Sequence, residues 1–238
     1  MTKTLILLSL LSFNLFAQEL PSQVNPVDSQ KISSLLPTTY FLPQEKNISC
    51  VGQYGGNGTV YTGKEKSQIL ELDGSLIATV CTRFYRYLTM EGSAVLKNQI
   101  AINYSGVVGN QKRFHALDRC AFGEGTRKDL CLLPYHSLAA DNKVHKIGDV
   151  IYIPKADGIV LPDGSIHEGF FIVRDTGGAF TGVGGQRVDM FTGTDPDNNN
   201  KFREAGFERT RPLEAFKING ASAEAIKLRL KDKFEELY

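Results

Sequence analysis

The chain has 238 residues, of which 42% are hydrophobic and 22% are charged, and 27 Lys and Arg against 26 Asp and Glu give a net charge of +1. A nearly neutral chain offers no overall attraction for nucleic acid or an acidic membrane surface, so we expect no nucleic-acid partner. It contains 23 glycines and no tryptophan. Many glycines among short β-branched runs are typical of a turn-rich β protein.

Residues 1–17 have the organisation of a secretory signal peptide. Lys3 makes the start basic, residues 5–16 are mostly apolar, and Ala17 precedes polar residues. The apolar run is shorter than the roughly 20 residues that span a bilayer, so a cleaved leader fits better than a transmembrane anchor. The sequence therefore predicts a periplasmic or secreted protein without a membrane anchor.

Four cysteines in an exported chain predict disulfides. Three pairings are possible, and we favour Cys120 with Cys131, which closes a short loop and leaves Cys50 with Cys81. The rival interpretation is a zinc site made by Cys120, Cys131 and His136, but this spacing fits none of the common zinc patterns. We expect no metal and no other cofactor.

The rest of the chain divides into three parts. Residues 18–45 are polar and contain four prolines, which predicts an extended arm. Residues 46–220 alternate short apolar runs with glycine-bearing turns, which predicts the strands of a barrel or sandwich. Residues 221–238 carry apolar side chains at helical spacing, which predicts a C-terminal helix packed on the barrel.

Three aspartates lie beside glycine-rich or apolar segments: Asp141, Asp175 and Asp189. Asp175 follows the predicted strand 170–173, and Asp189 stands inside the apolar strand 188–191. A buried carboxylate is costly unless it is paired or hydrogen-bonded. Such positions indicate a function, although a single aspartate near a turn is more often structural.

The aspartates belong to a longer series of motifs within residues 136–193. These are Leu-Ala-Ala-Asp, Gly-Asp-Val-Ile-Tyr-Ile-Pro, Asp-Thr-Gly-Gly-Ala and Arg-Val-Asp-Met-Phe-Thr-Gly. The series resembles the 3D domain, named for three aspartates, in the version found in the membrane-bound lytic transglycosylase A family. Two upstream segments, Met90–Ser93 and Tyr104–Gly106, resemble further motifs of that family.

The resemblance implies a mainly β fold, a double-psi β-barrel, whose groove binds a peptidoglycan glycan strand. Asp189 matches the catalytic aspartate, and Asp141 and Asp175 match the two supporting ones. The implied reaction uses one carboxyl group. It donates a proton to the oxygen between N-acetylmuramic acid and N-acetylglucosamine, then takes the proton of the muramic 6-hydroxyl as a 1,6-anhydro end forms. Burial and a nearby carboxylate would raise the pKa of Asp189 enough to keep it protonated.

The sequence departs from the family in three places. The family's second domain is missing, since His136 follows Gly106 by only 30 positions, and we expect the loop 116–134 to form the opposite wall. The 14 positions from Asp175 to Asp189 are slightly more than the family pattern has. Glu91 replaces a glutamine, and two carboxylates that flank a glycosidic bond can support hydrolysis. Glu124 is a weaker second candidate.

Five further residues are predicted to bind substrate. Tyr85 and Tyr87, as alternate residues of a strand, would share a face and stack on sugar rings. Gly177 and Gly178 belong to the Asp-Thr-Gly-Gly turn, and Arg187, or Arg174 as an alternative, could meet a lactyl or peptide carboxylate.

The sequence thus predicts an enzyme, a peptidoglycan lytic transglycosylase. One alternative is a muramidase, a lysozyme-like glycosidase on the same fold. The other is an expansin-like module that binds the cell wall without cutting it.

Overall fold

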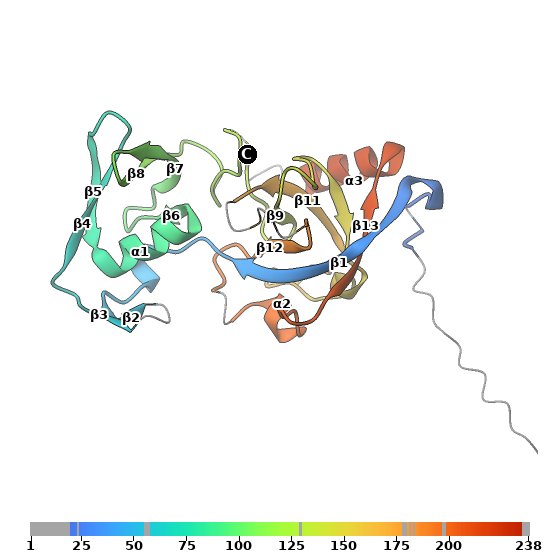
Figure 1. Cartoon of the computed structure of the whole chain (residues 1–238), viewed down its shortest axis with the longest axis horizontal. Coiled ribbons are helices and arrows are strands. Elements are labelled where there is room, and N and C mark those ends of the chain that lie inside the picture. Colours follow the sequence, from blue (N-terminus) through green and yellow to red (C-terminus); the bar gives the residue numbers. More distant parts are fainter. Residues whose placement is uncertain are drawn as a thin grey trace, which may run out of the picture.

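The computed structural model describes residues 20–234 except 23, 55–57, 129, 178–179, 181, 183 and 197–198. The predicted signal peptide lies outside this range. The described chain forms a closed barrel and a small lobe, residues 51–116, which is inserted after the first barrel strand (Figure 1). No helix within the described range is long and apolar enough to cross a membrane.

Six strands form a closed barrel, which confirms the predicted mainly β fold. In spatial order they are β1 (Ser29–Tyr40), β12 (Arg187–Phe191), β9 (Ser137–Ala140), β11 (Phe170–Asp175), β10 (Val150–Tyr152) and β13 (Leu213–Ile218). β1 pairs in parallel with β12 and β9 in parallel with β11, while the other pairs are antiparallel. Buried apolar side chains fill the barrel, among them Leu35, Leu138, Ile151, Phe171 and Met190.

The prediction of an extended arm over residues 18–45 is wrong for residues 29–40. They form β1, which crosses the barrel wall and pairs with both β12 and β13. A register shift between Ile32 and Leu35 breaks the alternation of polar and apolar residues that usually marks a strand. Leu35 is nevertheless fully buried in the core.

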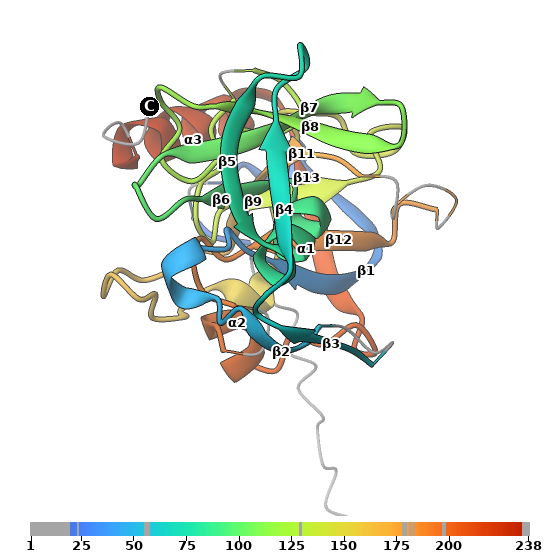
Figure 2. The same cartoon turned by 90° about the vertical axis from the view of Figure 1, so that its left-hand side faces the viewer.

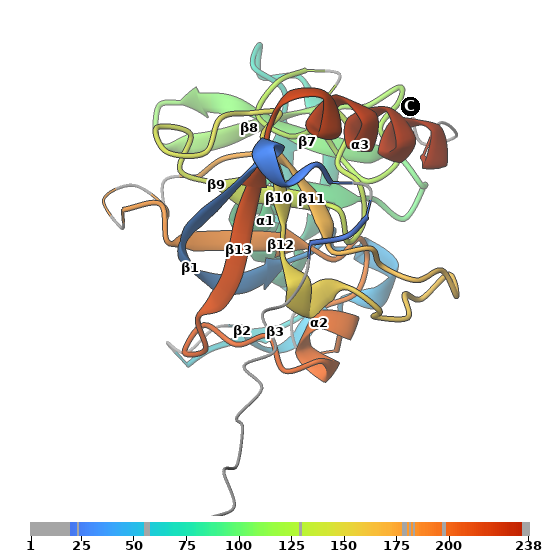
Figure 3. The ribbon, with the colours of Figure 1, turned by 90° about the vertical axis from the view of Figure 1, so that its right-hand side faces the viewer.

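Among the described residues, three short helices and one longer helix lie on the barrel side of the molecule. The short ones are η1 (Pro26–Asp28), η3 (Pro154–Ala156) and α2 (Lys201–Glu204). The longer one is α3 (Gly220–Lys233), whose Ile226 and Leu230 pack with the side chains of β10 and β11. Figure 3 shows α3 lying across one end of the barrel, as predicted for the C-terminal segment.

The small lobe corrects the expectation that residues 46–220 form one barrel. After η2 (Glu45–Asn47) come two hairpins, a helix and a three-stranded sheet (Figure 2). The elements are β2 (Val51–Tyr54), β3 (Thr59–Thr62), β4 (Lys66–Leu70), β5 (Leu76–Cys81), α1 (Thr82–Glu91), β6 (Ser93–Val95), β7 (Ala101–Val108) and β8 (Gln111–Ala116). The lobe has its own core, which includes Ile69, Phe84, Leu88, Ile102 and Phe114.

Tyr85 and Tyr87 lie on α1 and not on a strand. Residues two apart in a helix do not share a face, so the expected pair of stacked rings does not form. The ring of Tyr85 contacts Phe114 in the lobe core, at 6.4 Å between centroids. The strand prediction was wrong because aromatic residues favour strands. Burial of Phe84 and Leu88 on one face instead selects a helix.

Both favoured disulfides are confirmed. Cys50, just before the small lobe, bonds to Cys81 within it, and Cys120 bonds to Cys131 in the segment that leads back to the barrel. The zinc site is therefore wrong, since both of its cysteines are oxidised. The ring of its third member, His136, donates a hydrogen bond from Nδ1 to the Phe170 carbonyl and stacks on His167.

The Cys50–Cys81 bond should stabilise the small lobe strongly, because it closes a loop of sequence separation 31 around a small core. We expect the double substitution of Cys50→Ser and Cys81→Ser to cost about 2–4 kcal/mol. Thermal unfolding followed by calorimetry should show an earlier transition for the lobe than for the barrel. An unchanged melting profile would contradict this role.

Candidate active site

A cleft of about 460 Å³ lies between the barrel and the small lobe. Barrel residues form most of it, and Met90 and Glu91 at the end of α1 form the opposite side. The barrel residues that line it are Thr38, Thr39, Tyr40, Ala139, Asp175, Thr176, Gly177, Phe180, Arg187 and Asp189. The cleft thus collects two of the three predicted aspartates and Glu91.

Strand pairing explains why Asp175 and Asp189 meet. β9 lies between β11 and β12, and its Ala139 is the register partner of both aspartates. Neighbouring strands are about 4.8 Å apart, so the two aspartate backbones are separated by about two strand spacings across a small methyl side chain. Ala139 leaves the space above it open, and both carboxyl groups line that space.

The carboxyl group of Asp189 is largely buried. Its Oδ1 has no hydrogen-bond partner among the described residues, and Arg187 Nη2 lies 4.0 Å from Oδ2. Burial raises the pKa of Asp189, and a hydrogen bond from Thr38 and the Arg187 charge partly oppose that rise. An unpartnered buried oxygen at a cleft is costly and marks a group available to a ligand.

Asp175 ends β11 and is held more firmly. The Thr176 backbone N–H and the Thr126 hydroxyl both donate to its Oδ1, at 2.8 and 3.2 Å. Burial raises the pKa of Asp175 to about 6, the two hydrogen bonds oppose this rise, and the charge of Asp189 adds to it. Two carboxyl groups in one dry site repel when both are ionised, so the pair tends to keep a proton.

Tyr40, at the end of β1, is a site residue that the sequence analysis missed. Its side chain is 8% exposed, and its hydroxyl has no partner within the described structure. Burial raises the pKa of Tyr40 well above its usual value, and Asp175, Asp189 and Glu91 raise it further. The hydroxyl therefore stays protonated and can donate a hydrogen bond among three carboxyl groups.

Glu91 is the last residue of α1, and Gly92 ends the helix in the left-handed conformation at φ 85°. A carboxylate at a helix C-terminus is electrostatically unfavourable. Glu91 nevertheless lines the cleft with Asp175 and Asp189. The structure thus brings this predicted residue to the site, on the lobe side.

Other predicted residues divide between the cleft and other places. Gly177 and Arg187 line the cleft, and the Arg187 guanidinium lies 5.4 Å from the Phe180 ring centre. Gly178 lies outside the described residues. The ring of Tyr87 contacts Tyr54 and Phe41 beside the lobe and is not part of the cleft lining.

Asp141 does not line the cleft either. Its Oδ1 accepts a hydrogen bond from the Lys143 backbone N–H at 3.0 Å, and its carbonyl accepts from Val144 and His145. It caps the turn after β9 and so supports the site only through the backbone. Within the described residues, no cluster of three or more His, Cys, Asp or Glu side chains could hold a metal ion.

Comparison with known families finds a match for the segment that contributes Asp175 and Asp189 to the cleft. Residues 136–209 match the family model described as the 3D domain. Residues 136–209 of this chain are therefore similar to that domain. The matched range starts at the predicted residue 136 and includes all three aspartates and four barrel strands, β9 to β12.

Several solved structures are similar at low identity. Escherichia coli MltA with bound chitohexaose is 12% identical, with 78% of this chain and 71% of that chain covered and a TM-score of 0.48. A membrane-bound lytic murein transglycosylase from Agrobacterium tumefaciens is 14% identical, with 85% and 78% covered and a TM-score of 0.47. Neisseria gonorrhoeae MltA is 12% identical, with 81% and 74% covered and a TM-score of 0.43. No curated protein sequence matches the chain.

Asp175 should reduce the stability of the protein at neutral pH. Its folded pKa of about 6 exceeds the ordinary 3.8, so the folded state binds the proton more tightly, and stability falls as pH rises between these values. Asp175→Asn keeps an acceptor for both hydrogen bonds and removes the charge. We expect a gain of at most about 3 kcal/mol at pH 7.5 and little change at pH 4, measured by urea unfolding.

The matched control is Asp163→Asn. Hydrogen bonds from Ser165 lower the pKa of Asp163, so that substitution should not stabilise the protein at pH 7.5. Equal effects of the two substitutions, or a loss of stability in the Asp175 variant, would contradict the assignment.

Proposed function

We propose that this protein cleaves peptidoglycan glycan strands between N-acetylmuramic acid and N-acetylglucosamine as a lytic transglycosylase. The observation that carries the proposal is the pair of buried aspartates, Asp175 and Asp189, in the cleft of a 3D domain. We further propose that it acts outside the cytoplasm. The signal-peptide pattern of residues 1–17 and the two disulfides are consistent with this location.

Asp189 is the residue assigned to proton transfer. Asp175 Oδ1 already accepts two hydrogen bonds. Asp189 Oδ1 is buried and accepts no hydrogen bond from the residues that the structure describes. In the first half of the reaction, protonated Asp189 gives its proton to the glycosidic oxygen as the bond from C1 breaks. The raised pKa of Asp189 favours the protonated form that this step needs.

The second half of the reaction restores the acid. The Asp189 carboxylate takes the proton of the muramic 6-hydroxyl while O6 forms a bond to C1, which gives the 1,6-anhydro end. The attacking oxygen belongs to the substrate, so this route needs neither a second carboxylate nor a bound water. The neutral Tyr40 hydroxyl can donate to the Asp189 carboxylate between the steps.

Glu91 supports a second candidate, hydrolysis by a muramidase mechanism. It faces the barrel aspartates from the other side of the cleft, and two carboxyl groups on opposite sides of a glycosidic bond can activate water. A non-catalytic, expansin-like role is the third possibility, in which the same cleft holds glycan without cutting it.

The first test removes the assigned acid. Asp189→Asn keeps the shape of the side chain but cannot transfer the proton, and it should lower the release of muropeptides from purified sacculi by a factor on the order of 10²–10⁴. Chromatography of the soluble products gives the measurement. The control is Asp73→Asn, at an exposed turn of the small lobe.

Retained release by the Asp189 variant would show that another residue transfers the proton. If the unaltered protein releases nothing while still binding sacculi, the wall-binding module is the correct function.

The second test separates the two enzymatic routes by their products. Transglycosylation gives muropeptides lighter by one water than the reducing products of hydrolysis. We expect anhydro products from the unaltered protein and from Glu91→Gln, measured by mass spectrometry. Reducing products that disappear in the Glu91→Gln variant would instead establish the muramidase mechanism.

A further inference from the structure

The segment between β8 and β9 joins the small lobe to the barrel, and the Cys120–Cys131 bond closes part of it into a ring. We call residues 120–131 the cystine loop. Backbone hydrogen bonds cross it, from Gly125 N to the Leu130 carbonyl at 2.8 Å and from Leu132 N to the Gly123 carbonyl at 2.9 Å. A short ring with such internal bonds has few conformations.

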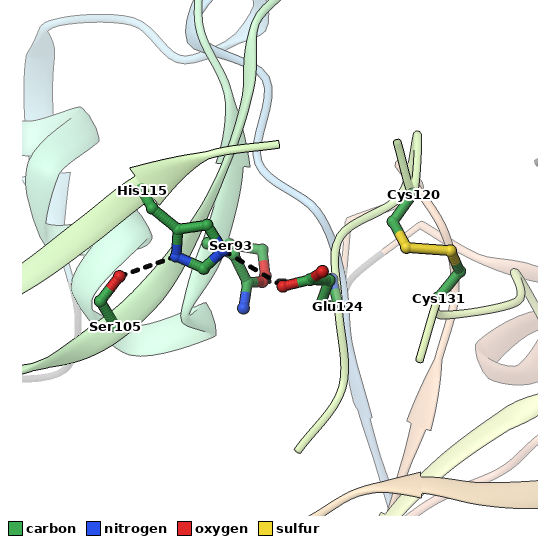
Figure 4. Close-up of polar contacts among 7 residues, drawn as sticks. Ser93, Ser105, His115, Cys120, Glu124 and Cys131 are labelled. Atoms are coloured by element: carbon green, nitrogen blue, oxygen red, sulfur yellow. Dashed lines mark hydrogen bonds and ion pairs between the residues drawn. A yellow bond between two sulfur atoms is a disulfide. The ribbon is translucent and has the colours of Figure 1, made fainter. Parts of the chain in front are cut away.

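One side of the cystine loop is fastened to the small lobe. Glu124 Oε2 lies 3.2 Å from His115 Nε2, and His115 Nδ1 lies 2.7 Å from the Ser105 hydroxyl (Figure 4). The Glu124 backbone N–H also donates to Asn103 Oδ1 at 3.2 Å. The Glu124 side chain is 4% exposed and that of His115 is 32% exposed, so these contacts are buried at the Glu124 end.

Ser105, His115 and Glu124 lie in the order of a hydrolase triad, with the histidine between the hydroxyl and the carboxylate (Figure 4). None of the three lines the cleft that holds the aspartates. Their third member belongs to the cystine loop, so the line of contacts serves as an attachment between β7, β8 and that loop.

The other side of the cystine loop lies against the end of β11. Thr126 N donates to the Arg174 carbonyl at 3.1 Å, and Arg174 Nη1 donates to the Cys131 carbonyl at 2.7 Å. A Cβ atom at Gly125 would lie 2.0 Å from the Arg174 carbonyl oxygen, so only glycine permits this approach. The approach brings the Thr126 hydroxyl to Asp175 Oδ1 at 3.2 Å.

We propose that Thr126 is a positioning residue for Asp175, and that the Glu124–His115 contact and the Cys120–Cys131 bond hold it there. The catalytic meaning of this inference rests on the proposed function, but the hydrogen bond from Thr126 to Asp175 does not. Thr126 and Thr176 donate to the same oxygen and so fix the rotation of the Asp175 carboxyl group. Through these contacts the small lobe affects Asp175, although Asp175 belongs to the barrel.

The pKa of Asp175 is the quantity to measure. The other titratable groups that line its cleft are Asp189 and Arg187 from β12, Glu91 from α1 and Tyr40 from β1. The Thr126 hydrogen bond favours the ionised carboxylate, so its removal should raise the pKa of Asp175. None of the other groups is altered by a substitution at Thr126.

The decisive variant is Thr126→Val in the full chain, which removes the hydroxyl and keeps the shape. We expect NMR titration of the carboxyl carbon to show the pKa of Asp175 raised by on the order of one unit. The acidic-side protonation step of the pH–rate profile should move in the same direction, with kcat changed more than KM. Thr126→Ser should restore the original value.

Thr62→Val is the matched control. The Thr62 hydroxyl donates to Glu65 in the small lobe at 2.9 Å, the same type of bond away from the cleft, so this variant should leave Asp175 unchanged. An unshifted Asp175 in the Thr126→Val variant overturns the positioning role. The NMR result is independent of activity, so a shift in a protein that cleaves no glycan would overturn the proposed function and keep the positioning role.

Glu124→Ala removes the partner of His115 and so tests the attachment. If the contact with His115 holds the cystine loop in place, this variant should shift the pKa of Asp175 in the same direction as Thr126→Val. The double variant should then shift it no further than Thr126→Val alone, because both act through one hydrogen bond. Additive shifts, or no shift with Glu124→Ala, would show that the loop stays in place without the lobe contact.

Discussion

The candidate site depends on the burial of two carboxyl groups beside one alanine. Ala139 pairs with both Asp175 and Asp189, so the barrel places the two groups in one confined space. Burial keeps their pKa values high, and repulsion between the two charges strengthens the effect on Asp175. Only a few hydrogen bonds oppose this rise in pKa. The two carboxyl groups are therefore unfavourable when both are ionised, and one of them can readily take up a proton.

The small lobe completes this environment because the barrel alone leaves one side of the cleft open. The lobe contributes Met90 and Glu91, and its position is set by two connections to the barrel. One connection follows β1, and the other contains the cystine loop. A lobe of this size buries a limited core, which explains the value of the Cys50–Cys81 bond within it.

The sequence predicted the parts of the fold and site that short local patterns encode. The apolar strands 150–153, 170–173 and 188–191 were identified from their residues, and the two barrel aspartates from motifs beside them. β1 was missed because its bulge breaks the alternating pattern, and with it the role of Tyr40 was missed. Thr126 could not be found, since its contact with Asp175 joins residues 49 positions apart and depends on the folded cystine loop.

The number of protons in the cleft limits which reaction it can perform. Asp175, Asp189 and Glu91 share a space with the buried Tyr40 hydroxyl, and three carboxylates there would repel one another. In the proposed reaction, one proton shared by the aspartates lets Asp189 act as acid and then as base on the substrate's own hydroxyl. Hydrolysis requires in addition that Glu91 activate a water beside the bond. The proposed transglycosylation thus needs fewer protein groups at the bond than the alternative of hydrolysis.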